Sequence, residues 1–244
     1  MRHLTANEIV RIWELGRSQH PLEQAITLLA VACPEMVLDE LVSLSIGQRD
    51  ASLLRLRELT FGARLNGFAE CPNCCHALEF GLDVADIRVP EPTPVVAEYT
   101  LAVEGIELRF RLPNTQDLLA VAGCQDAIAA REKLLQRCLL QVSREGTSLS
   151  QRELSPEAIA QLARQMAECD PQAEILLNLT CPVCDHHWQV LLDIGTFFWS
   201  EIAAHAKRLL REVHILARFY GWREADILSM SHQRRQFYLE MVEG

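Results

Sequence analysis

Two cysteine pairs are the residues of this chain best suited to chemistry. They are Cys71-Pro72-Asn73-Cys74 and, far downstream, Cys181-Pro182-Val183-Cys184. Two residues between cysteines allow a tight turn that directs both thiolates at one tetrahedral metal ion, with zinc–sulfur bonds of about 2.3 Å. Two such turns supply four thiolates and leave no open coordination position. The spacing therefore predicts a structural zinc site, with Cys71, Cys74, Cys181 and Cys184 as ligands.

The surroundings of the two pairs favour one zinc ribbon that is split in the sequence. Each pair precedes an apolar, strand-like run, at residues 78–84 and 188–194, and equivalent positions lie 110 residues apart. Joining the pairs closes a loop over residues 75–180, which costs about 4 kcal/mol of chain entropy plus a constant. A structural zinc contributes about 10–16 kcal/mol to folding, so the metal more than offsets the cost of the insertion.

Other uses of these cysteines stay open at this point. They could be unrelated thiol pairs or redox CxxC motifs, although neither pair begins a helix in a βαβ pattern. Both depart from the usual CPxCG pattern, because Cys75 and Asp185 stand where Gly normally accepts a positive φ angle. Alternative metal ligands are Cys75, His76, His186 and His187.

The composition limits the classes of function. The 244-residue chain is 49% hydrophobic and carries a net charge of −10, with a pI of about 5.3. An acidic chain repels phosphate backbones, which disfavours nucleic-acid binding. Apolar runs such as residues 26–33 are shorter than the ~18 residues of a membrane span, and charges at Arg2 and Glu8 argue against a signal peptide. We expect a cytoplasmic protein.

Five of the nine cysteines lie outside the two CxxC pairs. An odd remainder argues against a disulfide framework and fits a reducing compartment. Most of the five lie in apolar helical patterns, which indicates small buried hydrophobic residues. They are Cys33, Cys75, Cys124, Cys138 and Cys169.

The amino-terminal elements that position the first cysteine pair are expected to be helices. Thr5 and Glu8 have capping-box spacing and predict a helix start. Pro21 suits the first turn of a second helix, and a third is expected over about residues 48–59. The fold class is therefore α+β and mainly helical, with a helical unit at residues 1–62 and the split ribbon at 63–84 and 172–194.

Residues 85–171 form an insertion between the two halves of the ribbon. Pro90, Pro92 and Pro94 predict an extended linker. Residues 99–104 and 106–112 alternate in polarity around Gly105 and predict a β-hairpin, with Leu101 and Val103 facing Ile106, Leu108 or their neighbours in a register left open. Helices are expected from residue 114 or 115, over about 125–142 with Ile128, Leu139 and Val142 inward, and over 155–168.

The last segment, residues 195–244, is expected to be helical. Apolar residues recur at steps of three and four from Trp199 to Tyr220, and Gly221 suits a helix end. Packing on the protein's own core is favoured over a coiled-coil partner. Short helices follow at 223–228 and 232–242.

Aromatic residues and arginines concentrate near the carboxy terminus. Trp, Tyr and Arg dominate interface hot spots, so the cluster predicts a protein-docking surface, part of it a packed helical corner. A helix-turn-helix that binds DNA is the alternative, which the neighbouring acidic residues disfavour. The cluster comprises Phe219, Tyr220, Trp222, Arg223, Arg234, Arg235, Phe237 and Tyr238.

Enzymatic machinery is not evident in the sequence. We find no GxGxxG, P-loop, HExxH or GxSxG pattern, and no HxE that a zinc deaminase would need. His205 and His214 lie nine residues apart, too far to share a metal as an i, i+4 pair. We expect a non-enzymatic protein without a small-molecule substrate.

Three segments carry a resemblance to a known family. They are Ile46-Gly47-Gln48-Arg49-Asp50-Ala51 leading through Phe61-Gly62 to the first cysteine pair, residues 108–119, and residues 216–222 with 238–239. The chain resembles the baseplate hub assembly chaperones of contractile phage tails and phage-tail-like injection systems. The resemblance implies a zinc-ribbon helper that binds baseplate, hub or spike proteins during assembly. A zinc-ribbon DNA-binding regulator remains the alternative.

Overall fold

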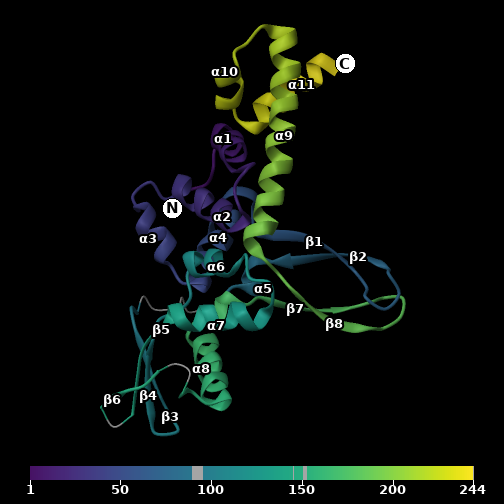
Figure 1. Ribbon diagram of the computed structural model, residues 1–244. Helices are drawn as coiled ribbons and strands as arrows, with labels where there is room; N and C mark the ends of the chain where they lie inside the picture. Colours follow the sequence, from purple (N-terminus) through teal and green to yellow (C-terminus); the bar gives the residue numbers. More distant parts are fainter. Residues whose placement is uncertain (90–95, 145, 151–152, 244) are drawn as a thin grey trace.

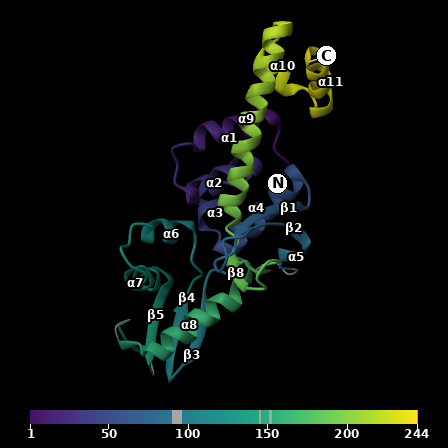
Figure 2. The same ribbon diagram turned by 90° about the vertical axis from the view of Figure 1, so that its right-hand side faces the viewer.

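The structure is a computed structural model that describes residues 1–89, 96–144, 146–150 and 153–243. It is α+β and mainly helical, as expected, with small antiparallel sheets. The long helix α9 (Ile194–Tyr220) is the axis of the molecule (Figures 1 and 2). The amino-terminal helices pack beside it, two β-hairpins project from its base, and the inserted sheet lies below them.

The amino-terminal helices are α1 (Ala6–Gly16), α2 (Pro21–Ala32), α3 (Leu38–Ser43) and α4 (Ile46–Phe61). Thr5 and Glu8 form the expected capping box at α1, and Pro21 begins α2. The third predicted helix is α4, which starts earlier than expected because Ser45 caps it. The sequence did not indicate α3, a helix too short for an apolar periodicity to be recognisable.

Helix α9 buries its apolar seam in the main core. Asp193 caps its first turn, and Gly221 ends it with a φ of 67°, as expected. Ile202, Ala206 and Leu216 are fully buried in one core with the amino-terminal helices, so the seam packs within the chain, the interpretation that the sequence favoured. Two short helices follow, α10 (Glu224–Ser229) and α11 (His232–Glu243).

Two hairpins form the body of the predicted ribbon. Strand β1 (Arg64–Glu70) pairs with β2 (Ala77–Asp83), and β7 (Leu176–Thr180) pairs with β8 (His187–Leu191), both antiparallel. Both hairpins contribute residues to the main core, in which Leu65, Leu177 and Leu179 are buried. The short helix α5 (Val84–Ile87) follows β2. Residues 192–194 do not extend the second strand as expected, since Ile194 begins α9.

The insertion contains a sheet in the order β3-β4-β5-β6. Its strands are β3 (Tyr99–Val103), β4 (Ile106–Phe110), β5 (Leu139–Arg144) and β6 (Thr147–Ser148). The predicted hairpin is present, and its register pairs Val103 with Ile106 and Leu101 with Leu108. The helices are α6 (Thr115–Val121), α7 (Ala127–Cys138) and α8 (Pro156–Cys169), followed by the 3-10 turn η2 (Pro171–Ala173). A second core joins the sheet to α8.

One predicted helix of the insertion is wrong over its last four residues. The helix expected over residues 125–142 ends at Cys138, and strand β5 begins at Leu139 and pairs with β4. Leu139 and Val142 are buried by that sheet rather than by a helix, while Ile128, expected to face inward, is 73% exposed. The linker prolines Pro90, Pro92 and Pro94 lie outside the described residues.

Candidate metal centre

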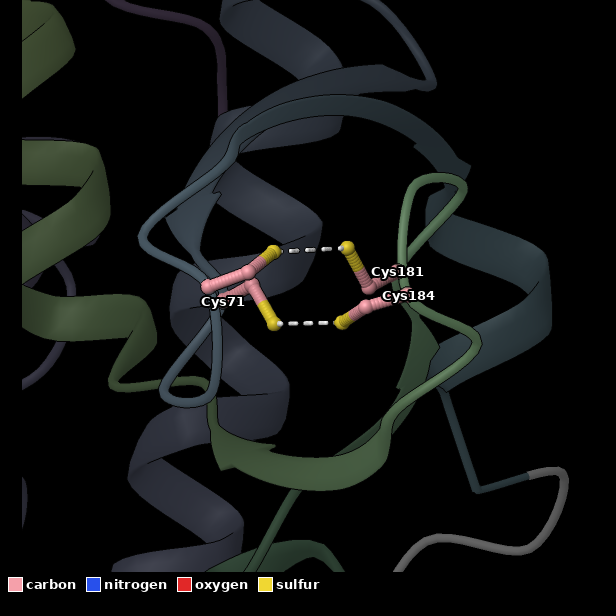
Figure 3. Close-up of side chains that lie close together, drawn as sticks. Cys71, Cys181 and Cys184 are labelled. Carbon is pink, nitrogen blue, oxygen red and sulfur yellow. Dashed lines mark hydrogen bonds between the residues drawn. The ribbon is translucent and has the colours of Figure 1, made fainter.

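The four predicted cysteine ligands come together at the tips of the two hairpins. The Sγ atoms of Cys71 and Cys184 lie 3.7 Å apart, and those of Cys74 and Cys181 lie 3.6 Å apart (Figure 3). All four sulfur atoms lie within 4.8 Å of one another. A metal–thiolate tetrahedron with bonds of about 2.3 Å has edges of about 3.8 Å. The four side chains can therefore hold one metal ion.

The two turns have the same backbone geometry. The N–H of Cys71 donates to the carbonyl of His76 and the N–H of Cys75 to that of Cys71. In the second hairpin the N–H of Cys181 donates to His186 in the same way, and that of Asp185 to Cys181. Each turn thus folds around its first cysteine and aims both thiols across to the other hairpin.

Cys75 and Asp185 both adopt the positive φ angle that the sequence predicts. Their φ values are 58° and 53°, in the left-handed region that a Gly would occupy in the usual pattern. The backbone turn therefore forms without glycine at either position. This match between two turns 110 residues apart in sequence shows that they are equivalent structural units.

The electrostatics of the cluster favour a bound cation. Hydrogen bonds from the side chain of Asn73 and the backbone N–H of His186 lower the pKa of Cys184 to about 6. The backbone of His76 lowers the pKa of Cys74, but contacts with the other thiols outweigh this effect and raise that pKa to about 12. The thiols in contact therefore differ in how readily they lose a proton. Four neighbouring thiolates repel one another, and a cation between them would remove this repulsion.

The alternative ligands lie outside the four-sulfur group. Within the described part of the chain, the group consists of cysteines alone. His187 Nδ1 lies 2.8 Å from the hydroxyl of Thr180, and His186 stacks on Trp188. Cys75 is exposed, and hydrogen bonding with Glu70 raises its pKa. Four thiolates leave no position for water or substrate, which fits a structural site and not a catalytic one.

The remaining cysteines behave partly as expected. Cys33 and Cys138 are buried, and Cys124 and Cys169 are half-buried. Cys75 is not a small buried hydrophobic residue, because it lies in the exposed turn. The two histidines of α9 do not share a site: His205 stacks on Phe61 at 4.2 Å and His214 is exposed.

The predicted docking residues, with one exception, gather where α9 ends and α11 packs against it. Tyr220 stacks on Trp222 at 4.4 Å, Tyr238 meets Trp222 edge to face at 4.8 Å, and the Arg234 guanidinium lies 5.7 Å from the Tyr238 ring centre. We call Phe219, Tyr220, Trp222, Arg223, Arg234, Phe237 and Tyr238 the aromatic–arginine cluster. The contacts between its rings make part of it a packed corner.

Arg235 does not belong to this surface. Its side chain is buried, its Nε donates to Glu212 at 2.9 Å, and Nη1 donates to the carbonyl of Met230. It therefore anchors α11 to α9 and is not accessible to a partner. The same burial removes one of the three arginines of the predicted cluster from any DNA-binding face.

Buried carboxylates are the features that sequence reasoning missed. Asp117 and Asp170 are nearly inaccessible to solvent and accept several hydrogen bonds each. Asp50 is also buried, which raises its pKa to about 6. Asp50 and Asp117 lie within the segments that carry the family resemblance. Asp170 lies outside those segments.

A comparison with protein families identifies the chain at the family level. The model described as T4 bacteriophage base plate protein matches residues 4–199. The chain belongs to this baseplate protein family. The match includes the amino-terminal helices, both cysteine pairs and the insertion, and it ends within α9. The aromatic–arginine cluster of this baseplate-family protein lies beyond it.

Other comparisons add no closer relative. No curated protein and no solved structure matches the chain. Among the described residues, none of the helices combines the length and apolar character that crossing a bilayer requires.

Proposed function

We propose that this protein is a non-enzymatic assembly chaperone or adaptor for the baseplate of a contractile phage tail or phage-tail-like injection system. Membership of the baseplate family supports a role among baseplate proteins. The resemblance to hub assembly chaperones supports action during assembly, with hub or spike proteins as partners. The protein acts in the cytoplasm, where such particles are built.

The four-cysteine centre holds a structural zinc ion in this proposal. Zinc is favoured because it accepts four thiolates in a tetrahedron whose edge length fits the observed sulfur–sulfur distances. The ion links the tips of the two hairpins. The whole insertion lies between these hairpins in the sequence. It contributes stability and relative positioning, and no chemical step.

The aromatic–arginine cluster is the proposed docking surface for a baseplate partner. Phe219 and Phe237 are 62% and 60% exposed, and Met241 beside them on α11 is 51% exposed. Large apolar side chains next to arginines are typical of the centre of a protein interface. This role extends beyond the family match, which ends before the cluster.

Co-expression tests the proposal. The protein is expressed with each baseplate, hub and spike protein of its own gene cluster, and complexes are isolated by affinity and size-exclusion chromatography. A stable complex with at least one of them, together with defective particle assembly after deletion of the gene, is expected. Normal assembly in the deletion strain and no complex with any of these proteins would refute it.

A further inference from the structure

An open groove of about 790 Å³ lies where the amino-terminal segment meets α9 and the α10–α11 turn. Its lining comes from four separate segments, within residues 3–9, 60–61, 205–209 and 228–235. Helices α1 and α10 lie side by side in this region (Figures 1 and 2). The metal centre uses none of the residues that line the groove.

The lining combines an apolar floor with basic side chains. Leu4, Ile9, Leu209 and Leu228 are buried beneath the groove, with Phe61 beside them. No Asp or Glu is among the described residues that line it. The basic residues of the lining are His3, His205, Arg208, His232 and Arg235.

The charges around the groove leave an excess of positive charge. Glu212 is the carboxylate shared by Arg208, at 3.6 Å, and Arg235, at 2.9 Å, so two guanidinium groups face one carboxylate. The nearby Glu201 is occupied by a bidentate ion pair with Arg57. The Arg208 side chain is half exposed. It is therefore the cation available to a ligand.

The His205 ring adds a polar wall rather than a second charge. Burial, with Arg208 as the next cause, lowers the pKa of His205, which favours the neutral ring. Its Nδ1 lies 3.1 Å from Nη2 of Arg208 and accepts from it. This contact holds the guanidinium at the edge of the groove.

We infer that this groove binds an acidic segment of a baseplate partner, with a carboxylate at Arg208 and a neighbouring apolar side chain on the floor formed by Leu4, Ile9 and Leu228. The inference rests on the proposed function, which supplies a protein partner. The positive charge of Arg208 favours an acidic segment as the ligand of the groove. With a net charge of −10, the chain as a whole repels acidic ligands, and the basic groove is an exception. Its volume, in the upper part of the range of about 300–1,000 Å³ for ligand sites, accommodates several side chains.

A matched pair of variants tests the inference. Arg208→Gln and Arg211→Gln remove the same charge from the same helix, but only Arg208 lines the groove, and Arg211 is exposed outside it. The affinity of each for the baseplate protein identified by co-expression is measured by calorimetry at two salt concentrations. Arg208→Gln is expected to weaken binding about tenfold or more and to reduce its salt dependence, whereas Arg211→Gln binds like the wild type.

A second variant guards against a folding defect, because Arg208 also contacts Glu212 and His205. Ser229→Glu places a negative charge in the groove without touching that network and is expected to weaken binding as well. Melting temperatures of all variants are compared. Wild-type affinity in both Arg208→Gln and Ser229→Glu overturns the groove assignment and leaves the proposed function intact. A wild-type protein that binds no baseplate protein, together with normal particle assembly in the deletion strain, refutes the proposed function itself.

A small-anion probe separates a peptide site from a general anion site. Citrate is added to the wild type and to Arg208→Gln, and the shift in melting temperature is measured. Little shift at millimolar citrate, with loss of partner binding in Arg208→Gln, supports the protein segment. A large shift that depends on Arg208, with partner binding unchanged in the variant, overturns the assignment in favour of a small polycarboxylate ligand.

Discussion

Asp170 accepts a hydrogen bond from the backbone N–H of Gly47 at 2.9 Å and another from the hydroxyl of Ser45 at 3.0 Å. The carboxylate lies between α8 and η2. It accepts from a free backbone N–H at the amino-terminal end of α4, 123 residues away in the sequence. The positive end of the helix dipole favours a negative charge there. This contact, buried at the junction of the two cores, fixes the insertion to the amino-terminal helices.

Gly47→Ala is expected to weaken that junction. A Cβ at Gly47 would lie 2.1 Å from the Asp170 carboxylate oxygen and 2.9 Å from the backbone nitrogen of Ala173. The carboxylate must move, and the hydrogen bonds to α4 lengthen. We expect a loss of about 1–3 kcal/mol in the free energy of unfolding, measured by urea denaturation.

Gly123→Ala is the control, because nothing lies within 4 Å of a Cβ at that position. It should leave the stability within about 0.5 kcal/mol of the wild type. Equal stability of the Gly47→Ala and wild-type proteins would contradict the role assigned to the contact.

Local signals in the sequence determined the parts of the fold that could be predicted. The capping box at Thr5 and the glycine at position 221 act within one turn of chain, and both were located correctly. The cysteine turns were also predictable, since CxxC spacing and a positive φ at Cys75 are properties of a few neighbouring residues. The four-residue site followed from these turns because a metal needs all four thiolates.

Long-range pairing determined the parts that could not be predicted. Leu135, Cys138, Leu139 and Val142 have helical spacing, yet β4 recruits residues 139–144 as a strand and overrides that periodicity. Arginine is usually a surface residue, so the sequence predicts that Arg235 is exposed. In the structure its side chain is buried because it pairs with Glu212 of α9. The pairing of β4 with β5 and that of Glu212 with Arg235 join segments far apart in the sequence, so local patterns do not indicate them.

Loss of a cysteine ligand is predicted to break the link between the tips of the two hairpins. Cys71→Ser and Cys184→Ser each remove one thiolate from the four-sulfur group, so the proposed zinc ion and its contribution to folding would be lost. The two hairpins are then no longer linked at their tips. A structural zinc contributes about 10–16 kcal/mol to folding, so its loss is expected to lower the melting temperature by more than about 10 °C. Chelation of zinc from the wild type should give the same shift.

Cys75→Ser is the matched control, one residue from a ligand in the same exposed turn but outside the four-sulfur group. It should keep a full equivalent of zinc, measured by atomic absorption. X-ray absorption of the wild type should show four sulfur ligands. A nitrogen ligand, or full zinc occupancy in Cys71→Ser, would refute the four-thiolate assignment.

The stability of the insertion is predicted to fall in acid because of Asp117. This buried carboxylate pairs with Arg111 at 2.5 and 2.9 Å and with Arg137 at 2.7 Å. Burial alone would raise its pKa, but the bonds from Arg111, Asn114 and Arg137 outweigh burial and lower it to about 2. A lowered carboxyl pKa stabilises the fold above the ordinary value of 3.8, and this stabilisation is lost as the pH falls from about 4 to 2.

Asp117→Asn tests the sign of this effect. The variant should be clearly less stable than the wild type at pH 6, and the difference should shrink as the pH approaches 2. Denaturant midpoints at several pH values measure both proteins, and other titrating groups, including Glu8 and Asp50, cancel in the difference. A stability difference that is independent of pH would show that Asp117 does not carry the charge in these ion pairs.

The aromatic–arginine cluster is predicted to affect partner binding without affecting the fold. Phe219→Ser and Phe237→Ser change side chains that are more than half exposed, so the stability should stay within about 0.5 kcal/mol of the wild type. If this surface is the centre of the interface, each change weakens binding to the baseplate partner by about 2 kcal/mol, close to thirtyfold. Ile128→Ser on α7, 73% exposed and outside the cluster, is the control. Calorimetric titration that shows equal affinity for all three variants would place the partner elsewhere on the protein.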